Sequence, residues 1–455
     1  MKKYDIIVIG TGGGTKLRPA SELGYKVAMI EKGKLGGTCL NRGCIPSKML
    51  IYPAHVATHT KDAKKINLNT QFKGADFSKL ISRINRDINS DSNAIEEYYK
   101  TTKKFDFYKG EAKFISDKIV EVNGKKLTAK YIFIAVGARP RIPPIPGLEG
   151  TPYMTSTEAL TNKKLPKKLL VIGGGYIACE IGYAYSALGS SVEFIVRSGL
   201  LGREDSDIQK EFAKVFTKQQ KVHLGHSTQK VEYKNTTFTL TLKDKKGKTK
   251  KLKGDALLVA TGVIPNNDKL NLQNTKIKLN KRGFLKVNKY LETNVKGVFG
   301  LGDCVGNYMF RHSVNFEGEH LFNTLIKKKK KNPIKYPPMP HAVFSYPEIA
   351  AVGKTEDELK KEGEKYIVGM NTYKKSAQGM ARKPDHGFVK LLFDKKSRKL
   401  LGAHIIGDEA SNMIHQLIYA MTFNAKAEDL LNMIYIHPAL PEIVRNAVRK
   451  AQRMF

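Results

Sequence analysis

The sequence predicts an α/β protein with two Rossmann-like dinucleotide-binding domains followed by a C-terminal α+β domain. A glycine-rich turn between two apolar runs occurs twice, once near residue 10 and again near residue 173. The chain has 455 residues, which is more than one hydrophobic core usually supports. These observations together indicate a multidomain enzyme built around two nucleotide sites.

The first nucleotide site is expected at the N-terminus. Residues 5–9 and 26–30 are apolar runs suited to buried parallel strands, with a helix expected between them. The turn after the first run contains four glycines, Gly10 and residues 12–14, and the candidate cofactor-binding positions among them are Gly10, Gly12 and Gly14. Such glycines allow a tight turn and a close approach of the backbone to a pyrophosphate. Glu31, about twenty residues further on, can accept hydrogen bonds from a ribose. Thr15 stands where the third glycine or an alanine of such a turn is usual, so we expect slightly looser packing of the helix against the strand.

The second nucleotide site follows the same pattern without the acidic residue. Strands are expected at 169–172 and 191–196, and the turn between them contains Gly173 and Gly175. Val196 stands where a ribose-binding carboxylate is usual, and Arg197 and Arg203 follow it. A carboxylate repels a 2′-phosphate, whereas guanidinium groups bind it through charge-assisted hydrogen bonds. The second site is therefore predicted to take NADPH, with NADH as the alternative. Two exposed arginines without a ligand are the other interpretation.

Composition points to a cytoplasmic protein. The first 14 residues resemble a short signal peptide, but they lead into the glycine cluster without a cleavage site, so a first strand is expected. No apolar run is long enough for a membrane span. Four cysteines in a chain of this length do not form the disulfide framework of a secreted protein.

The net charge of +37 is the most unusual global property. Lysines are spread along the chain, and the densest runs, at 245–253 and 327–331, contain no aromatic residues. No nucleic-acid-binding motif is present. We expect a solvated lysine-rich surface. A polyanion partner and a field that attracts anionic substrates are the alternatives.

Cys39 and Cys44 are separated by four residues and lie just beyond Glu31. A structural disulfide, half of a metal site and a redox pair are the three interpretations. Cys179 and Cys304 are isolated, so no metal site is expected. Two dinucleotide sites are explained most simply by a flavin and a nicotinamide, and a flavin can pass two electrons to a disulfide. Pro46 suits the first turn of a helix whose N-terminus would favour a thiolate at Cys44.

Several ordered motifs are similar to those of one enzyme family. The segment 36–48, GGTCLNRGCIPSK, resembles the redox-active disulfide box of the FAD-dependent pyridine nucleotide–disulfide oxidoreductases of class I. Four further motifs resemble that family: residues 135–140, 260–262, 298–303 and 436–442. The resemblance runs from end to end. The members of this family include lipoamide dehydrogenase, glutathione reductase, mycothione reductase and mercuric reductase.

The resemblance implies two cofactors, FAD and NADPH. It assigns nine residues to FAD binding: Gly10, Gly12, Gly14, Glu31, Gly37, Thr38, Gly137, Gly302 and Asp303. It assigns six to the nicotinamide dinucleotide: Gly173, Gly175, Tyr176, Arg197, Arg203 and Gly262. Tyr176 occupies the position of the family's gating tyrosine, and packing alone is its other interpretation.

The resemblance also implies a catalytic set and a homodimer. Cys44 would be the flavin-facing charge-transfer thiol, and Cys39 the interchange thiol that attacks a disulfide. His437 would be the acid–base group. The remaining catalytic residues are a supporting set: Lys48 and Glu180 as an ion pair beside the flavin, and Glu442 as the orienter of His437. His437 and Glu442 would complete the site of the other subunit. Arg42, between the cysteines, is expected to face solvent.

The implied architecture has three domains, the last of them an α+β dimerisation domain. Residues 1–150 and 266–335 would bind FAD, 151–265 would bind NAD(P), and 336–455 would form the interface. A small-molecule thiol disulfide, as for mycothione or glutathione reductase, is the preferred substrate, and dihydrolipoamide is the alternative. Mercury reduction is a less favoured alternative, because mercuric reductases have a C-terminal cysteine pair and this chain has no cysteine after Cys304. The alternative from outside enzyme catalysis is a redox-sensing flavoprotein that binds nucleic acid.

Overall fold

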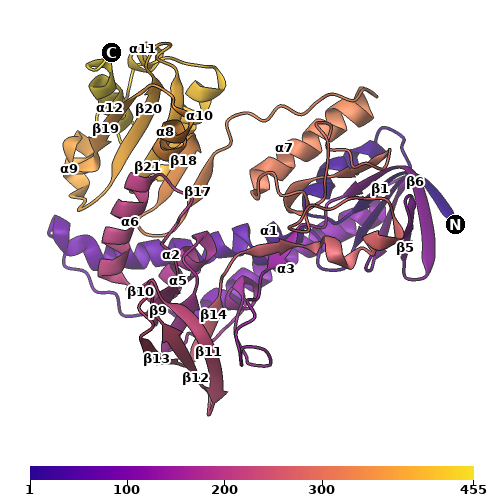
Figure 1. Ribbon diagram of the computed structural model, residues 1–455, viewed down its shortest axis with the longest axis horizontal. Coiled ribbons are helices and arrows are strands. Elements are labelled where there is room, and N and C mark those ends of the chain that lie inside the picture. Colours follow the sequence, from indigo (N-terminus) through magenta and orange to yellow (C-terminus); the bar gives the residue numbers. More distant parts are fainter. The chain divides into compact units, whose positions relative to one another are not determined.

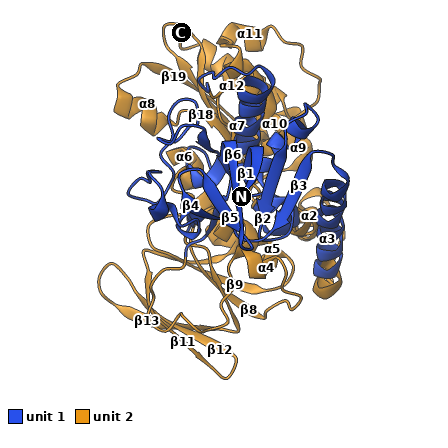
Figure 2. Cartoon of the chain, turned by 90° about the vertical axis from the view of Figure 1, so that its right-hand side faces the viewer, with its two compact units in different colours: residues 1–47, 81–141, 262–335 blue, residues 48–80, 142–261, 336–455 orange.

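The computed structural model describes residues 1–455, and the chain divides into two compact units (Figure 2). Unit 1 contains residues 1–47, 81–141 and 262–335, and unit 2 contains residues 48–80, 142–261 and 336–455. None of the helices combines the length and the apolar character needed to cross a membrane. The three-domain boundaries expected from the sequence stay a prediction.

A parallel sheet forms the centre of unit 1 (Figure 1). Its strands, in spatial order, are β3 (Phe105–Lys109), β2 (Val27–Glu31), β1 (Lys2–Ile9), β6 (Lys125–Ile134) and β16 (Val298–Gly300). This is the strand order of a dinucleotide-binding domain. Antiparallel strands β5 (Ile119–Val122) and β4 (Lys113–Ser116) continue the sheet from the first half of β6. Alternate residues of β1 are buried on opposite faces, Ile7 in one core and Val8 in the other. Burial on both faces explains the continuous apolar run in the sequence.

The helix expected after the first glycine turn is present, and it is a 3₁₀ helix rather than an α-helix. Residues Gly13–Ser21 form a 3₁₀ helix, η1. Pro19 lies inside this segment and has no N–H to donate, and Gly13 and Gly14 have low helix propensity. The Thr15 hydroxyl donates a hydrogen bond to the Gly12 carbonyl at 2.9 Å, which ties the residue into the turn.

The rest of unit 1 surrounds the sheet with helices and short turns. Its α-helices are α1 (Gly37–Arg42), the beginning of α2 (Cys44–Asp62), most of α3 (Phe77–Thr101) and α7 (Arg311–Leu321). A two-stranded ribbon pairs β7 (Ala138–Pro140) with β15 (Val263–Pro265). The short helical turns are η3 (Asn266–Lys269), η4 (Leu272–Asn274), η5 (Gly302–Cys304) and the π-helical η6 (Phe322–Lys327).

Unit 2 contains the second nucleotide-binding sheet. Four parallel strands lie in the order β10 (Lys221–Leu224), β9 (Ser191–Val196), β8 (Lys168–Ile172) and β14 (Ala256–Val259). Helix α5 (Tyr176–Ala187) connects β8 to β9, and α6 (Ser206–Gln219) connects β9 to β10. An antiparallel meander and two short helices complete this part: β11 (Ser227–Lys234), β12 (Thr237–Lys243), β13 (Thr249–Gly254), α4 (Ser156–Ala159) and η2 (Ala63–Ile66). The strands predicted at 169–172 and 191–196 are confirmed.

The C-terminal part of unit 2 is an antiparallel sheet with helices (Figure 1). Its strands are β17 (His341–Val343), β18 (Ile349–Gly353), β21 (Leu400–Ile406), β20 (Phe388–Asp394) and β19 (Tyr366–Thr372), in spatial order. Its helices are α8 (Glu356–Glu362), η7 (Tyr373–Lys375), α9 (Ala377–Arg382), α10 (Ala410–Thr422), α11 (Ala427–Leu431) and α12 (Glu442–Gln452). One sheet face packs on α10 and α12 in a shared apolar core. The sequence patterns predict strands at 387–393 and 400–406 and helices at 410–424 and 442–453. The structure differs from these ranges by at most two residues at each end.

A buried lysine occupies the other face of this sheet. Val389 and Leu391 on β20 face the apolar core, so Lys390 between them points the opposite way. Its ammonium lies 2.8 Å from Asp205, 2.7 Å from Asp207 and 2.6 Å from Glu356. Burial alone would lower the pKa of Lys390, but these three carboxylates outweigh that effect and raise it. The cluster joins β20 to the start of α6 and to α8, and one buried cation therefore orders three elements.

Candidate active site

The first glycine turn is shaped by close backbone contacts in unit 1. Gly10 has a φ of +101°, and a Cβ there would lie 2.4 Å from the carbonyl oxygen of Ala135. A Cβ on Gly37 would lie 2.5 Å from the Cα of Gly12. Side chains are therefore excluded where the turn meets α1. Glu31, at the end of β2, accepts hydrogen bonds from the Thr11 N–H at 2.9 Å and the Thr11 hydroxyl at 2.8 Å. Glu31 is thus hydrogen-bonded directly to the glycine turn.

Asp303 lies just beyond β16, at the same edge of the sheet as the turn after β1. Burial raises the pKa of this carboxyl group to about 6. Gly302 beside it donates its N–H to the buried Glu317 at 2.6 Å. A buried acid without a compensating cation is costly unless a ligand supplies hydrogen-bond donors. The glycine cradle, Glu31 and Asp303 fit the pyrophosphate, ribose and ribityl hydroxyls of FAD.

The two cysteines lie on consecutive helices. Cys39 is half-buried in α1, and Cys44 is exposed as the first residue of α2. The predicted helix N-terminus at Cys44 is confirmed, and Pro46 lies in its first turn, where no N–H is needed. A Cβ on Gly43, between the helices, would lie 2.9 Å from the Thr38 carbonyl oxygen, so this link requires glycine. Arg42 is exposed, as expected.

Gly137 and Gly262 lie beside the paired strands β7 and β15. Both have positive φ angles, +67° for Gly137 and +107° for Gly262, and both have open space where a Cβ would be. The Gly137 carbonyl accepts the Asn266 N–H at 3.0 Å, and the Gly262 carbonyl accepts the Arg141 N–H at 2.9 Å. Both glycines are part of unit 1.

The second glycine turn, in unit 2, repeats the geometry of the first. Gly173 has a φ of +142°, and a Cβ there would lie 2.3 Å from the Ala260 carbonyl oxygen. Gly175 precedes α5 and has open space around it. Val196 ends β9 and is buried, while Arg197 and Arg203 in the following loop are exposed and form no ion pair within the chain. Both guanidinium groups are therefore available to an anion.

The predicted pair of Lys48 and Glu180 is present in unit 2. The Lys48 ammonium lies 2.6 Å from one oxygen of Glu180. The other oxygen of Glu180 accepts the Phe344 N–H at 3.0 Å, and the carboxylate is buried. The ammonium also lies 4.2 Å from the centre of the Phe344 ring. Glu180 therefore fixes the position of the Lys48 cation. Its place beside a flavin stays a prediction.

His437 and Glu442 form the predicted pair near the C-terminus. The Nδ1 of His437 lies 3.0 Å from Glu442, which also accepts hydrogen bonds from Arg445 at 2.6 Å and from the Ala439 N–H at 3.2 Å. Burial would raise the pKa of Glu442, but these hydrogen bonds outweigh it and hold the pKa below its usual value. An ionised Glu442 accepts the Nδ1 proton, so Nε2 is left to exchange protons. The imidazole side chain is 70% exposed.

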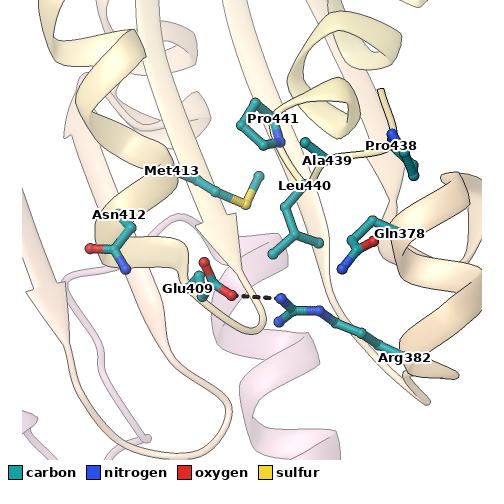
Figure 3. Close-up of a pocket in the computed structure, with 9 residues that line it drawn as sticks. All are labelled: Gln378, Arg382, Glu409, Asn412, Met413, Pro438, Ala439, Leu440 and Pro441. Atoms are coloured by element: carbon teal, nitrogen blue, oxygen red, sulfur yellow. Dashed lines mark hydrogen bonds and ion pairs between the residues drawn. The ribbon is translucent and has the colours of Figure 1, made fainter. Parts of the chain in front are cut away.

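The residues that directly follow His437 in the chain line a cavity of about 310 Å³ (Figure 3). Its lining residues are Gln378, Arg382, Glu409, Asn412, Met413, Pro438, Ala439, Leu440 and Pro441. Arg382 and Glu409 form an ion pair of 2.7 Å across it, and the other lining is mostly apolar. A mostly apolar hollow that contains one ion pair therefore lies next to the acid–base pair.

A hydrogen-bond network at the second turn has no counterpart in the local sequence patterns. The Tyr176 hydroxyl donates to Glu204 at 2.5 Å, and His341 Nε2 lies 3.1 Å from both Glu204 oxygens. Glu204 directly follows Arg203, a predicted nucleotide-binding residue, and this neighbour is the one local hint in the sequence that Glu204 lies near the site. No local pattern links it to His341, which lies 137 residues further along the chain.

Comparisons with known proteins agree with this geometry. A family model described as pyridine nucleotide-disulphide oxidoreductase matches residues 4–318, and the dimerisation domain of that family matches residues 339–448. The HOCl-induced flavoprotein disulfide reductase RclA from Escherichia coli, solved as a Cu(II) complex, has a similar structure. Its TM-score is 0.88 with 27% sequence identity, and the match covers 99% of each chain.

Three curated relatives match over most of their length. Mycothione reductase of Mycobacterium tuberculosis is 33% identical over 98% of this chain and 99% of its own. Dihydrolipoyl dehydrogenase of Dictyostelium discoideum is 34% identical over 99% of this chain and 94% of its own. Mercuric reductase of Staphylococcus aureus is 33% identical over 94% of this chain and 78% of its own. With two nucleotide-binding domains and a dimerisation domain, the chain belongs to the pyridine nucleotide-disulphide oxidoreductases, FAD-dependent enzymes that act on sulfur groups.

Proposed function

We propose that this protein is a homodimeric NADPH-dependent reductase of a small-molecule thiol disulfide. The observation that carries the proposal is the pair Cys39 and Cys44, with Cys44 at the N-terminus of the 19-residue helix α2. A helix N-terminus favours a thiolate, which is the reactive form in thiol–disulfide exchange. The overall reaction consumes NADPH, a proton and one disulfide, and it yields NADP⁺ and two thiols.

FAD, when bound, accepts a hydride from the nicotinamide and passes two electrons to the Cys39–Cys44 disulfide. In unit 1, the glycine cradle, Glu31 and Asp303 would hold its pyrophosphate, ribose and ribityl chain. In unit 2, Lys48 would supply a cation for the ring system, with Glu180 fixing its position. The assignment rests on the shape of the cradle and on the half-buried Asp303, whose pKa is raised by desolvation.

The thiols then reduce the substrate in two exchange steps. The Cys39 thiolate attacks one sulfur of the substrate disulfide, which forms a mixed disulfide and releases the first thiolate. His437 of the partner subunit donates a proton from Nε2 to that thiolate. The Cys44 thiolate next attacks the Cys39 sulfur, which restores the Cys39–Cys44 disulfide and releases the second thiolate for protonation. The ionised Glu442 stabilises the imidazolium form of the histidine between these transfers.

The two exposed arginines support NADPH as the electron donor. We expect an Arg197→Ala/Arg203→Ala variant to lose about 100-fold in kcat/KM for NADPH, because two charge-assisted contacts to a 2′-phosphate are removed. For NADH the value is expected to stay within about twofold, because NADH has no 2′-phosphate. Steady-state kinetics with both donors measure this. Lys210→Ala, which removes an exposed cation from α6, is the matched control. Equal losses with both donors would contradict the assignment.

Asp303→Asn tests the flavin site through two effects of opposite sign. In the folded chain burial raises the Asp303 pKa from 3.8 to about 6, so the folded state retains a proton that the unfolded state releases. Stability therefore falls as pH rises between these values, and about 3 kcal/mol is lost above them. The variant should recover stability in the flavin-free protein at pH 7.5 and should gain little at pH 4. Thermal unfolding at the two pH values measures this.

The same variant should bind FAD at least about tenfold more weakly, because the amide loses a charge-assisted hydrogen-bond acceptor. Fluorescence titration of the flavin-free protein gives the dissociation constant. Asp91→Asn, at an exposed position on α3, is the control. Unchanged flavin affinity in Asp303→Asn would remove this residue from the proposed site.

An anaerobic titration tests the proposed function as a whole. NADPH and NADH are compared as reductants, and the reduced protein is then offered a panel containing mycothione, glutathione disulfide and lipoamide. Rapid turnover of a small thiol disulfide with NADPH is the expected result. Turnover confined to lipoamide with the NAD couple would instead favour the dihydrolipoyl dehydrogenase activity, since such an enzyme of Dictyostelium discoideum is 34% identical.

A further inference from the structure

Arg203 lies at the tip of a tight turn in unit 2, in the loop between β9 and α6. The Glu204 N–H donates to the Leu201 carbonyl at 2.9 Å, so Gly202 and Arg203 are the two central residues of this turn. Leu201 is 1% exposed, and its N–H donates to the Gly174 carbonyl at 2.8 Å. The start of the turn is therefore fixed to the second glycine turn.

The tip of the turn has little packing of its own. Gly202 has open space where a Cβ would be, so no close contact restricts it there, and glycine has the largest backbone freedom of any residue. Arg203 is exposed and forms no ion pair within the chain. The position of the guanidinium group therefore depends on how firmly the two ends of the turn are held.

Two adjacent buried acids hold the end of the turn. Glu204 is 3% exposed, and both of its carboxylate oxygens lie 3.1 Å from the Nε2 of His341 on β17. Asp205 is fully buried. One of its oxygens accepts a hydrogen bond from Lys390 on β20 at 2.8 Å, and the other accepts the Glu356 N–H at 3.0 Å. The C-terminal sheet thus fixes the backbone beside Arg203.

The pair of Lys390 and Asp205, which we call the anchor, is held by charge on both sides. Lys390 is fully buried and also contacts Asp207 at 2.7 Å and Glu356 at 2.6 Å. A buried charge is costly to separate from its partners, so the ammonium cannot easily leave this cluster. Asp205 also accepts the Asp207 N–H at 3.0 Å as the N-cap of α6. The anchor therefore fixes the chain two residues after Arg203.

We propose that Lys390 is a positioning residue for Arg203. By holding Asp205, it fixes the end of the turn and keeps the Arg203 guanidinium where it meets the 2′-phosphate of NADPH. The proposal rests on the proposed function, which assigns Arg203 to that phosphate. Arg197 directly follows β9, whose pairing with β8 and β10 positions it without the anchor. The preference for NADPH over NADH thus depends in part on a buried lysine of the C-terminal sheet.

Calorimetric titration of the FAD-bound protein with NADP⁺ and NAD⁺ tests the anchor. Lys390→Met removes the cation and keeps most of the side-chain volume. NADP⁺ should bind about tenfold more weakly than to the native chain, because one charge-assisted contact loses its fixed geometry, whereas the affinity for NAD⁺ should stay within about twofold. Equal losses for the two dinucleotides would overturn the proposal.

Asp205→Asn is a milder variant of the same test. The amide oxygen can still cap α6, and Lys390 keeps Asp207 and Glu356 as partners, so no buried cation is left alone. We expect the same selective loss of NADP⁺ affinity with a smaller size. This variant decides the question if Lys390→Met does not fold.

Leu391→Ala is the matched control for lost stability. Leu391 follows Lys390 on β20 but faces the apolar core on the opposite side of the sheet. This variant should lower the free energy of unfolding and leave the affinities for NADP⁺ and NAD⁺ native. A loss of NADP⁺ affinity as large as that in Lys390→Met would show a general weakening of the fold and would overturn the anchor.

A double-mutant cycle tests whether Lys390 acts through Arg203. In the Arg203→Ala background, Lys390→Met should cause no further loss of NADP⁺ affinity, because the residue that it positions is absent. In the Arg197→Ala background, Lys390→Met should keep its full effect. Additive losses for Lys390→Met and Arg203→Ala would contradict the proposal.

The two proposals fail in different ways. If neither dinucleotide binds to the native FAD-bound protein, or if Arg203→Ala binds NADP⁺ with native affinity, the proposed function is wrong in its assignment of this site, and the anchor falls with it. If Arg203→Ala weakens NADP⁺ binding but Lys390→Met and Asp205→Asn have native affinity, the anchor alone is wrong.

Discussion

We expect a Cys39→Ser variant to reduce no disulfide substrate, with kcat lower by at least about 10⁴-fold. A serine hydroxyl does not ionise near neutral pH and cannot form a mixed disulfide, so the first exchange step is lost. NADPH oxidation with a quinone should persist, because that acceptor requires no thiol. Anaerobic turnover with the disulfide panel and with the quinone measures both activities.

Cys179→Ala is the matched control for this variant. Cys179 is fully buried, and burial raises the pKa of its thiol, so it is not expected to take part in exchange. The control should keep native turnover. Disulfide reduction by Cys39→Ser above about one-tenth of the native rate would contradict the assignment of Cys39 as the attacking nucleophile.

Alkylation separates the roles of the two cysteines. In the two-electron-reduced, FAD-bound protein, iodoacetamide should label Cys39 first, because Cys44 is assigned to the flavin side. Exposure in the chain alone would predict the reverse, since Cys44 is exposed and Cys39 is half-buried. Peptide mass spectrometry after one equivalent of label decides between them. Preferential labelling of Cys44 would exchange the two roles.

The second large effect is expected for His437→Ala, with kcat for disulfide reduction lower by about 10²–10⁴-fold. The leaving thiolate then departs without a proton, which is slow for an ordinary alkyl thiol. A disulfide whose thiol has a low pKa, such as 5,5′-dithiobis(2-nitrobenzoate), should be reduced at nearly the native rate, because its thiolate leaves unaided. Reduction of the protein by NADPH should be unchanged. Rapid-reaction and steady-state kinetics measure these three quantities.

Controls for this variant follow from the local geometry. Glu442→Gln should have a smaller loss than His437→Ala, because an amide oxygen can still accept the Nδ1 proton without stabilising a charged imidazole. His226→Ala, at a histidine whose ring hydrogen-bonds to the Leu224 carbonyl and lies edge-on to the His223 ring, should be native. Equal losses with alkyl and low-pKa disulfides would show that His437 is not the proton donor.

Mixing the two inactive variants tests whether the site is shared between subunits. In a mixed dimer of Cys39→Ser and His437→Ala chains, one site combines native cysteines with a native histidine from the other chain. Random exchange should therefore restore about one-quarter of the native activity, as expected for a two-fold symmetric dimer. If the histidine served its own chain, no native site would form and no activity would return.

Local sequence patterns predicted the nucleotide turns and the helix that begins at Cys44, whereas the family resemblance suggested the pair of His437 and Glu442. These features are made by residues within a few positions of one another, and their backbone requirements select residue types directly. Gly10 illustrates this, because a side chain there would collide with the Ala135 carbonyl. The glycine pattern predicts a helix after the turn but not its 3₁₀ form, which Pro19 inside η1 favours because it has no N–H to donate.

Contacts between distant positions could be fixed only by the tertiary structure. Lys390 reads as a polar interruption of an apolar strand, yet it is fully buried among three carboxylates. Lys48 and Glu180 are 132 positions apart, and only the family resemblance suggested their pairing. The sequence thus determined the cofactor-binding fold and the redox segment. The tertiary structure decided which charges are buried together, because burial and partner geometry depend on packing that no local pattern encodes.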